Sequence, residues 1–141
     1  MQTNTSILAL DVGGRRIGVA LASRVACLPG PFTTLEQGEK LFDQIAQIIN
    51  QENIDLIVIG LPRNLDGQRT QQTTDTEDFT TELKKHITIP TVFQDEALTS
   101  RYAKEELESR GRPYTKSDVD ALAATYILKD YLTENVISNR K

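Results

Sequence analysis

The sequence predicts one α/β domain with a mixed five-stranded sheet, in which three antiparallel strands come first and parallel strands follow. Two observations favour this fold class: an apolar hairpin pattern opens the chain, and helical and strand patterns alternate after it. The size agrees, because 141 residues and 15.8 kDa suffice for one compact core but fall short of two ordinary domains. We therefore expect a single domain over residues 1–141, with helices flanking the sheet.

The three antiparallel strands are expected at the beginning of the chain. Two apolar stretches, 6–12 and 17–22, are separated by the pair Gly13-Gly14, a pattern typical of a β-hairpin. A third extended segment should occupy part of 25–35. Prolines interrupt this segment, and because proline donates no ladder hydrogen bond, the strand should lie at the edge of the sheet.

The rest of the chain alternates between helix and strand. Apolar residues at helical spacing predict a helix over 39–50 that lays one face on the sheet. The nearly continuous apolar run 54–60 predicts a parallel strand covered on both faces, followed by a polar loop. The remaining expected elements are helices over 73–85, 100–109 and 117–132, a short strand over 91–94 and a breaker at 111–113.

Composition excludes several kinds of site. No apolar run approaches the roughly 18 residues that a membrane span needs, and the first six residues do not resemble a signal peptide. We therefore expect a cytoplasmic protein without membrane contact. The only cysteine, Cys27, has no disulfide partner, and the only histidine, His86, excludes a site of several His and Cys ligands. Any metal must therefore be held by carboxylates.

The charge balance gives a mixed indication about nucleic acid. A net charge of -4 and a pI of about 5.0 argue against broad binding to a polyanion. Local clusters of basic residues argue the other way, although they also suit an ordinary solvated surface. The clusters are Arg15, Arg16 and Arg24 near the N-terminus, and Arg101, Lys104, Arg110, Arg112 and Lys116 before the last predicted helix.

Three acidic positions stand at the ends of predicted elements. Asp11 lies near the end of an apolar strand, Glu96 just past another strand, and Asp120 in the first turn of the last helix. Converging carboxylates stay ionised together only when cations neutralise them, and hard oxygen ligands suit Mg²⁺ or Mn²⁺. Two such ions about 4 Å apart activate water and stabilise the leaving oxygen of a phosphodiester. The composition is thus compatible with phosphodiester hydrolysis.

Each acid also has a purely structural explanation. Asp11 can pair with a neighbouring arginine, and Glu96 can start a loop or cap the following helix. Asp120 can complete a capping box with Ser117, and a negative charge at a helix start is favourable by about 0.3–1 kcal/mol. The spacing alone leaves both explanations open.

Four motifs in order resemble the YqgF family, the Holliday-junction-resolvase-like proteins also described as pre-16S rRNA nucleases, over nearly the whole chain. The motifs are Leu10-Asp11-Val12-Gly13 continuing through Arg16-Ile17-Gly18-Val19-Ala20, Ile59-Gly60-Leu61-Pro62 with Asp66-Gly67, Asp95-Glu96 with Leu98-Thr99, and Asp120-Ala121-Leu122-Ala123-Ala124 with Ile127-Leu128. The resemblance implies a ribonuclease-H-like fold and a metal-dependent endonuclease. It also implies a role in processing the 5′ end of pre-16S rRNA in ribosome biogenesis.

Site residues follow from matching positions. The resemblance implies that Asp11, Glu96 and Asp120 are the catalytic acids and bind Mg²⁺ or Mn²⁺. Other positions match the family's substrate groove or carry a charge suited to a nucleic-acid backbone. These candidate substrate-binding residues are Arg16, Arg63, Asp66, Arg101 and Lys116.

One position departs from the family pattern. The family usually has an arginine directly after the acidic pair, where this chain has Ala97. A guanidinium there would clamp a phosphate or orient Glu96. Reduced activity or an altered substrate is therefore expected unless Arg101, one helical turn away, replaces it.

Three other functions stay open at this point. A Holliday-junction resolvase would act on branched DNA and would require a two-fold dimer to cut symmetrically. A sugar kinase or actin-like ATPase would need two lobes, of which 141 residues supply about one. A non-catalytic module would bind nucleic acid without cleaving it. The sequence does not decide between structured RNA and branched DNA, or between a monomer and a homodimer.

Overall fold

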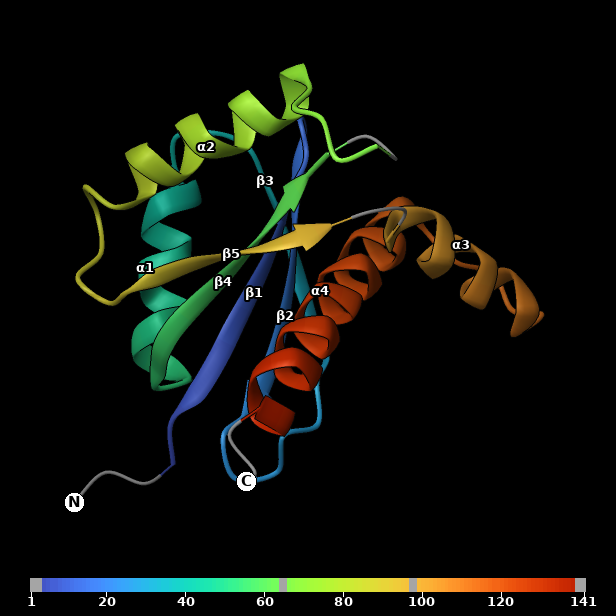
Figure 1. Ribbon diagram of the computed structural model, residues 1–141, viewed down its shortest axis with the longest axis horizontal. Coiled ribbons are helices and arrows are strands. Elements are labelled where there is room, and N and C mark those ends of the chain that lie inside the picture. Colours follow the sequence, from blue (N-terminus) through green and yellow to red (C-terminus); the bar gives the residue numbers. More distant parts are fainter. Residues whose placement is uncertain (1–3, 64–65, 97–98, 139–141) are drawn as a thin grey trace.

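A mixed five-stranded sheet with the order β3-β2-β1-β4-β5 forms the centre of the computed structural model, which describes residues 4–63, 66–96 and 99–138 (Figure 1). Strands β1, β2 and β3 are antiparallel neighbours, whereas β4 is parallel to both β1 and β5. The predicted sheet is confirmed. In chain order the elements are β1 (Ser6–Val12), β2 (Arg16–Ser23), β3 (Gly30–Glu36), α1 (Leu41–Gln51), β4 (Ile54–Pro62), α2 (Gln71–Leu83), β5 (Thr91–Glu96), α3 (Thr99–Ser109) and α4 (Lys116–Ser138).

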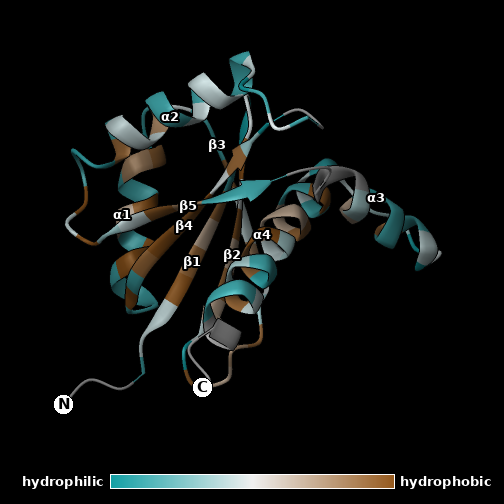
Figure 2. Ribbon diagram, in the orientation of Figure 1, coloured by the Kyte–Doolittle hydropathy of each residue, from teal (hydrophilic) through white to brown (hydrophobic). Residues whose placement is uncertain are grey.

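Helices cover both faces of the sheet. Helices α1 and α2 lie on one face and α4 on the other, with α3 packed on the outside of α4 (Figure 1). Side chains alternate along β1, so that Leu8 and Leu10 pack towards α1 while Ile7 and Ala9 pack towards α4. The central strands β1 and β4 are accordingly among the most hydrophobic parts of the molecule, whereas β5 ends in hydrophilic residues (Figure 2). None of the helices in the described ranges is long and apolar enough to cross a membrane.

Several element ends differ from the expected ones, and at the start of α2 a side-chain cap is the reason. Helix α2 begins at Gln71, two residues earlier than predicted, because the side chains of Thr70 and Thr73 each accept a hydrogen bond from the other residue's backbone N–H. Helix α4 extends to Ser138 rather than ending near residue 132. The third strand lies at the edge, as predicted, and the register with β2 shifts close to Pro31.

Candidate active site

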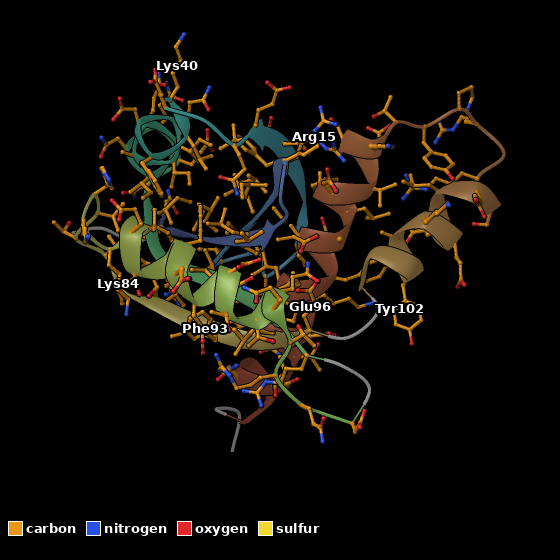
Figure 3. All side chains as sticks on the ribbon, turned by 90° about the horizontal axis from the view of Figure 1, so that it is seen from above. Arg15, Lys40, Lys84, Phe93, Glu96 and Tyr102 are labelled. Carbon is orange, nitrogen blue, oxygen red and sulfur yellow. The ribbon has the colours of Figure 1, made fainter. Side chains whose placement is uncertain are left out.

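The three predicted acids lie on the face of the sheet that α4 covers. Asp11 is the sixth residue of β1, Glu96 ends β5, and Asp120 lies in the first turns of α4. Both strands present their carboxyl ends at the same edge of the sheet, where ligands gather in α/β folds. Viewed onto this edge, Glu96 lies near the middle of the molecule, between α2 and α4 (Figure 3).

Gly60 makes room for Glu96 to approach Asp11. Strand β4 stands between β1 and β5, so the two carboxylates meet only across β4. A Cβ atom at Gly60 would lie 2.9 Å from Oε2 of Glu96 and 2.4 Å from Cδ1 of Ile127. The missing side chain is therefore what leaves space for the carboxylate above the middle strand.

Gly18 makes room for the backbone of Asp120 on the neighbouring helix α4. It is the direct antiparallel partner of Asp11, so the two residues face the same side of the sheet. A Cβ atom at Gly18 would lie 1.9 Å from the backbone oxygen of Asp120, closer than any real contact. Helix α4 thus approaches β2 beside Asp11 only because residue 18 has no side chain. The sequence reasoning did not single out this residue, although an isolated glycine within an apolar strand signals close backbone approach.

The environment of Asp11 is that of an acid with like-charged neighbours. Burial raises its pKa well above the ordinary value of 3.8, and the negative charge of Glu96, a hydrogen bond shared with Glu96, and the charge of Asp120 raise it further. The alternative in which Asp11 pairs with a neighbouring arginine is wrong. Asp11 is instead part of a carboxylate cluster that has too little positive charge to ionise readily.

Asp120 is held by Arg16. The Arg16 Nε donates a 2.6 Å hydrogen bond to Oδ2 of Asp120, and both side chains are less than a third exposed. Asp120 does not cap its helix. Thr115 and Asp118 form the capping box, with bonds of 3.2 Å from the Asp118 N–H and 2.9 Å from the Thr115 N–H. The alternative in which Asp120 pairs with Ser117 is therefore wrong, because α4 begins earlier than predicted.

The donor set suits a hard divalent cation. The three acids offer only carboxylate oxygens, and the raised pKa of Asp11 reflects a cluster whose charge a cation would neutralise. Within the described residues, no three Asp, Glu, His or Cys side chains are arranged as they would be around a bound ion. The contacts explain this, since Asp11 and Glu96 share a hydrogen bond while Arg16 holds Asp120. The residues fit a metal in chemistry: a bound ion would replace the hydrogen bond between Asp11 and Glu96, whereas Arg16 holds Oδ2 of Asp120.

The other predicted site residues are spread around this centre. Lys116, the first residue of α4, lines a cavity together with Arg16 and Asp120. The Nε atom of Arg63 lies 3.4 Å from Oδ1 of Asp95. The Asp95 side chain is exposed and is on the opposite face of β5 from Glu96. Asp66 is exposed in the turn before α2.

The departure from the family pattern is not resolved by the described residues. Ala97 lies outside them. Arg101 belongs to α3, but its side chain is also outside the part of the chain that the structure describes. Both therefore keep their predicted roles as hypotheses.

A ribonuclease-H-like sheet with acids from two strand ends and one helix defines a class of nucleases, and solved structures share the fold. RuvC of Thermus thermophilus matches with a TM-score of 0.54 at 10% identity, over 92% of this chain and 96% of that one. The fowlpox virus resolvase in complex with Holliday junction DNA matches with a TM-score of 0.51 at 10% identity, over 94% and 99%. The human cytomegalovirus terminase nuclease domain, soaked with Mn, matches with a TM-score of 0.50 at 12% identity, over 94% and 83%.

Sequence comparison identifies the family. The model of the RuvX family, described as Holliday junction resolvase, matches residues 5–134, and the chain belongs to this family. A relative from Sulfurihydrogenibium sp. is 37% identical over 135 residues, which cover 94% of this chain and 93% of the relative. Another, from Chloroflexus aurantiacus, is 37% identical over 130 residues, covering 89% and 85%. Both are named as proposed pre-16S rRNA nucleases. The resemblance to the YqgF family is thereby confirmed.

Proposed function

We propose that this chain is a metal-dependent endonuclease that hydrolyses phosphodiester bonds in pre-16S rRNA, at its 5′ end, during ribosome biogenesis in the cytoplasm. The observation that carries the proposal is the meeting of Asp11, Glu96 and Asp120, which come from three separate elements, at one edge of the sheet. Membership of a nuclease family and the names of the curated relatives support the substrate.

The three acids are proposed as ligands of Mg²⁺ or Mn²⁺. Such a cation, when bound, activates water and neutralises charge on the phosphate undergoing displacement. The chain's own residues prepare the site. Gly18 and Gly60 leave the space in which the carboxylates approach one another, and Arg16 fixes one oxygen of Asp120. Rigid strands and a long helix, rather than loops, hold all three acids, which keeps their geometry reproducible.

Cleavage of labelled pre-16S rRNA tests the proposal directly. With Mg²⁺ or Mn²⁺ the wild-type protein should cut the RNA, and EDTA should stop the reaction. Asp11→Asn should lower the rate at least about a hundredfold, because a carboxylate ligand and its charge are lost. Asp43→Asn provides a matched control, since Asp43 is an exposed acid on α1. Absence of cutting by folded wild-type protein with either metal would overturn the proposal.

Branched DNA is the second candidate substrate, because the family model is described as a Holliday junction resolvase. A four-way junction assayed beside the RNA separates the two. Preferential, symmetric cutting of the junction would favour DNA and would require a two-fold dimer, which light scattering detects. Junction cutting by a monomer, or RNA cutting alone, would count against the resolvase.

A further inference from the structure

A cavity of about 290 Å³ opens directly beside Asp120. Its lining consists of Gly13, Gly14, Arg15, Arg16, Lys116 and Asp120, so that it joins the turn between β1 and β2 to the first residue of α4. The cavity therefore shares Asp120 with the carboxylate centre and has Arg15 in its lining. Figure 3 shows Arg15 beside the start of α4.

The charges in this cavity divide into two kinds. Arg16 and Asp120 form an ion pair and largely neutralise one another. Arg15 and Lys116 are exposed, and among the described residues neither has an acidic partner within ion-pair distance. Two cations of the cavity, on Arg15 and Lys116, are thus outside the ion pairs of the described residues. An anion placed between them would be attracted by both.

The neighbouring cavity on the other side of the turn lacks this excess charge. It has a volume of about 310 Å³ and contains Arg15 and Arg16, but also Glu36. Glu36 brings a carboxylate into that cavity together with Arg15, and this carboxylate would repel an anion there. An anion reaching Arg15 is therefore favoured on the side of Asp120 and Lys116, where it also lies next to the carboxylate centre.

The backbone that carries the two free cations is braced. In the turn, the Gly13 N–H donates to the carbonyl of Arg16 at 2.9 Å, and the Gln37 backbone N–H donates to the carbonyl of Arg15 at 2.9 Å. The Gln37 side-chain amide also donates to the carbonyl of Gly13 at 2.9 Å. On the other wall, the Thr34 hydroxyl donates to the carbonyl of Ser117 at 2.8 Å. The backbone positions from which the two side chains extend are thus fixed before a ligand arrives, which lowers part of the entropic cost of binding.

We infer that this cavity binds a phosphodiester group of the substrate backbone adjacent to the one that is cleaved, with Arg15 and Lys116 as its ligands. The inference rests on the proposed nuclease function and deepens it, because it gives the bound strand a path from the carboxylate centre towards the turn between β1 and β2. Arg16 has a different role: its Nε–H holds Oδ2 of Asp120, so we assign it to positioning Asp120.

Binding measured without turnover tests this subsite. The double substitution Arg15→Gln with Lys116→Gln is made in an Asp11→Asn background, and the anisotropy of a labelled single-stranded RNA of precursor sequence is followed as NaCl is increased. The affinity should fall about tenfold, as expected for the loss of a charged hydrogen-bonding contact. The slope of log affinity against log salt should decrease by about 0.7, the value for one phosphate of a single strand.

The matched control removes the same charge elsewhere. Lys40→Gln with Lys84→Gln alters two exposed lysines near α1 and α2, away from Arg15 (Figure 3). This control should leave both affinity and slope within error of the parent. An equal loss in the control, or parental binding by the cavity variant, would overturn the subsite. All four side chains are exposed, so melting curves should coincide.

Two further arms separate the possible outcomes. Inorganic phosphate at matched ionic strength should compete weakly with the RNA. If the cavity variant lost affinity for phosphate alone and kept its affinity for RNA, the cavity would be a free-phosphate site and the inference would be wrong. Cleavage is assayed separately, so that failure of the nuclease proposal, meaning no metal-dependent cutting, is distinguishable from failure of the subsite.

Discussion

At the scale of single residues, two glycines contribute as much to the candidate site as the acids do. Asp11 lies on β1, and the strands on either side of β1 carry a glycine on the same face of the sheet. One glycine admits the helix that carries Asp120, and the other admits the side chain of Glu96. The resemblance identified the three acids from the sequence. An isolated glycine in a strand signals close approach of a neighbour, but the sequence could not show that the neighbour at Gly18 is α4.

Gly60→Ala should separate Glu96 from Asp11. The new methyl group would collide with Ile127 and with the Glu96 carboxylate, and overpacking of this kind costs about 1–3 kcal/mol. Urea unfolding should register this loss, and RNA cleavage should fall at least about tenfold because Glu96 is displaced. Gly38→Ala is the control, since nothing lies within 4 Å of a Cβ there. Normal cleavage by a destabilised Gly60→Ala protein would mean that Gly60 does not place Glu96.

At the scale of elements, periodicity predicted where helices and strands lie, but capping boxes determine where α2 and α4 begin. This difference matters most for α4. A start at Ser117 would make Asp120 a capping residue, whereas the observed box of Thr115 and Asp118 leaves Asp120 two residues further in, facing the sheet. Spacing alone could not distinguish the two starts, because both place an acid three residues after a hydroxyl side chain.

The pairing of α3 with α4 includes a polar contact whose strength should depend on pH. Hydrogen bonds from Tyr126 and from Arg110 lower the pKa of Glu106 below its ordinary value of 4.5. Because the folded-state pKa is the lower one, the contribution of Glu106 to stability is complete above pH 4.5 and is lost as the pH falls through the folded-state value.

Tyr126→Phe tests this contact between the helices. It should lower the free energy of unfolding at neutral pH by about 0.5–1.5 kcal/mol, the net value of one hydrogen bond. The difference from wild type should shrink as the pH falls below 4.5 and through the lowered folded-state pKa, where Glu106 becomes protonated. Tyr102→Phe, at an exposed tyrosine on the same pair of helices, should have no effect. A difference that stayed constant in acid would show that the hydroxyl acts through something other than the carboxylate.

At the scale of the whole molecule, the candidate site joins segments that are distant in sequence. Arg16 and Asp120, for example, are separated by 104 positions. The sequence could place each acid at the end of an element, and the resemblance could group them. The sequence could not reveal that Arg16 is engaged with Asp120 while Arg15 stays free, because that distinction arises only when β2 and α4 are packed together.

A cation bound by the three acids would connect β1, β5 and α4 and should therefore stabilise the fold. At a Mg²⁺ concentration of about 100 times its dissociation constant, the free energy of unfolding should rise by about 2.7 kcal/mol.

Hydrogen exchange should show which parts of the fold the cation stabilises. Amides at the carboxyl ends of β1 and β5 and in the first turns of α4 should exchange more slowly, whereas locally opening amides of α1, on the opposite face, should not change. Asp11→Asn should abolish both responses, and NaCl at equal ionic strength should reproduce neither. Uniform slowing that persisted in Asp11→Asn would indicate a general salt effect and would remove the metal from the proposed mechanism.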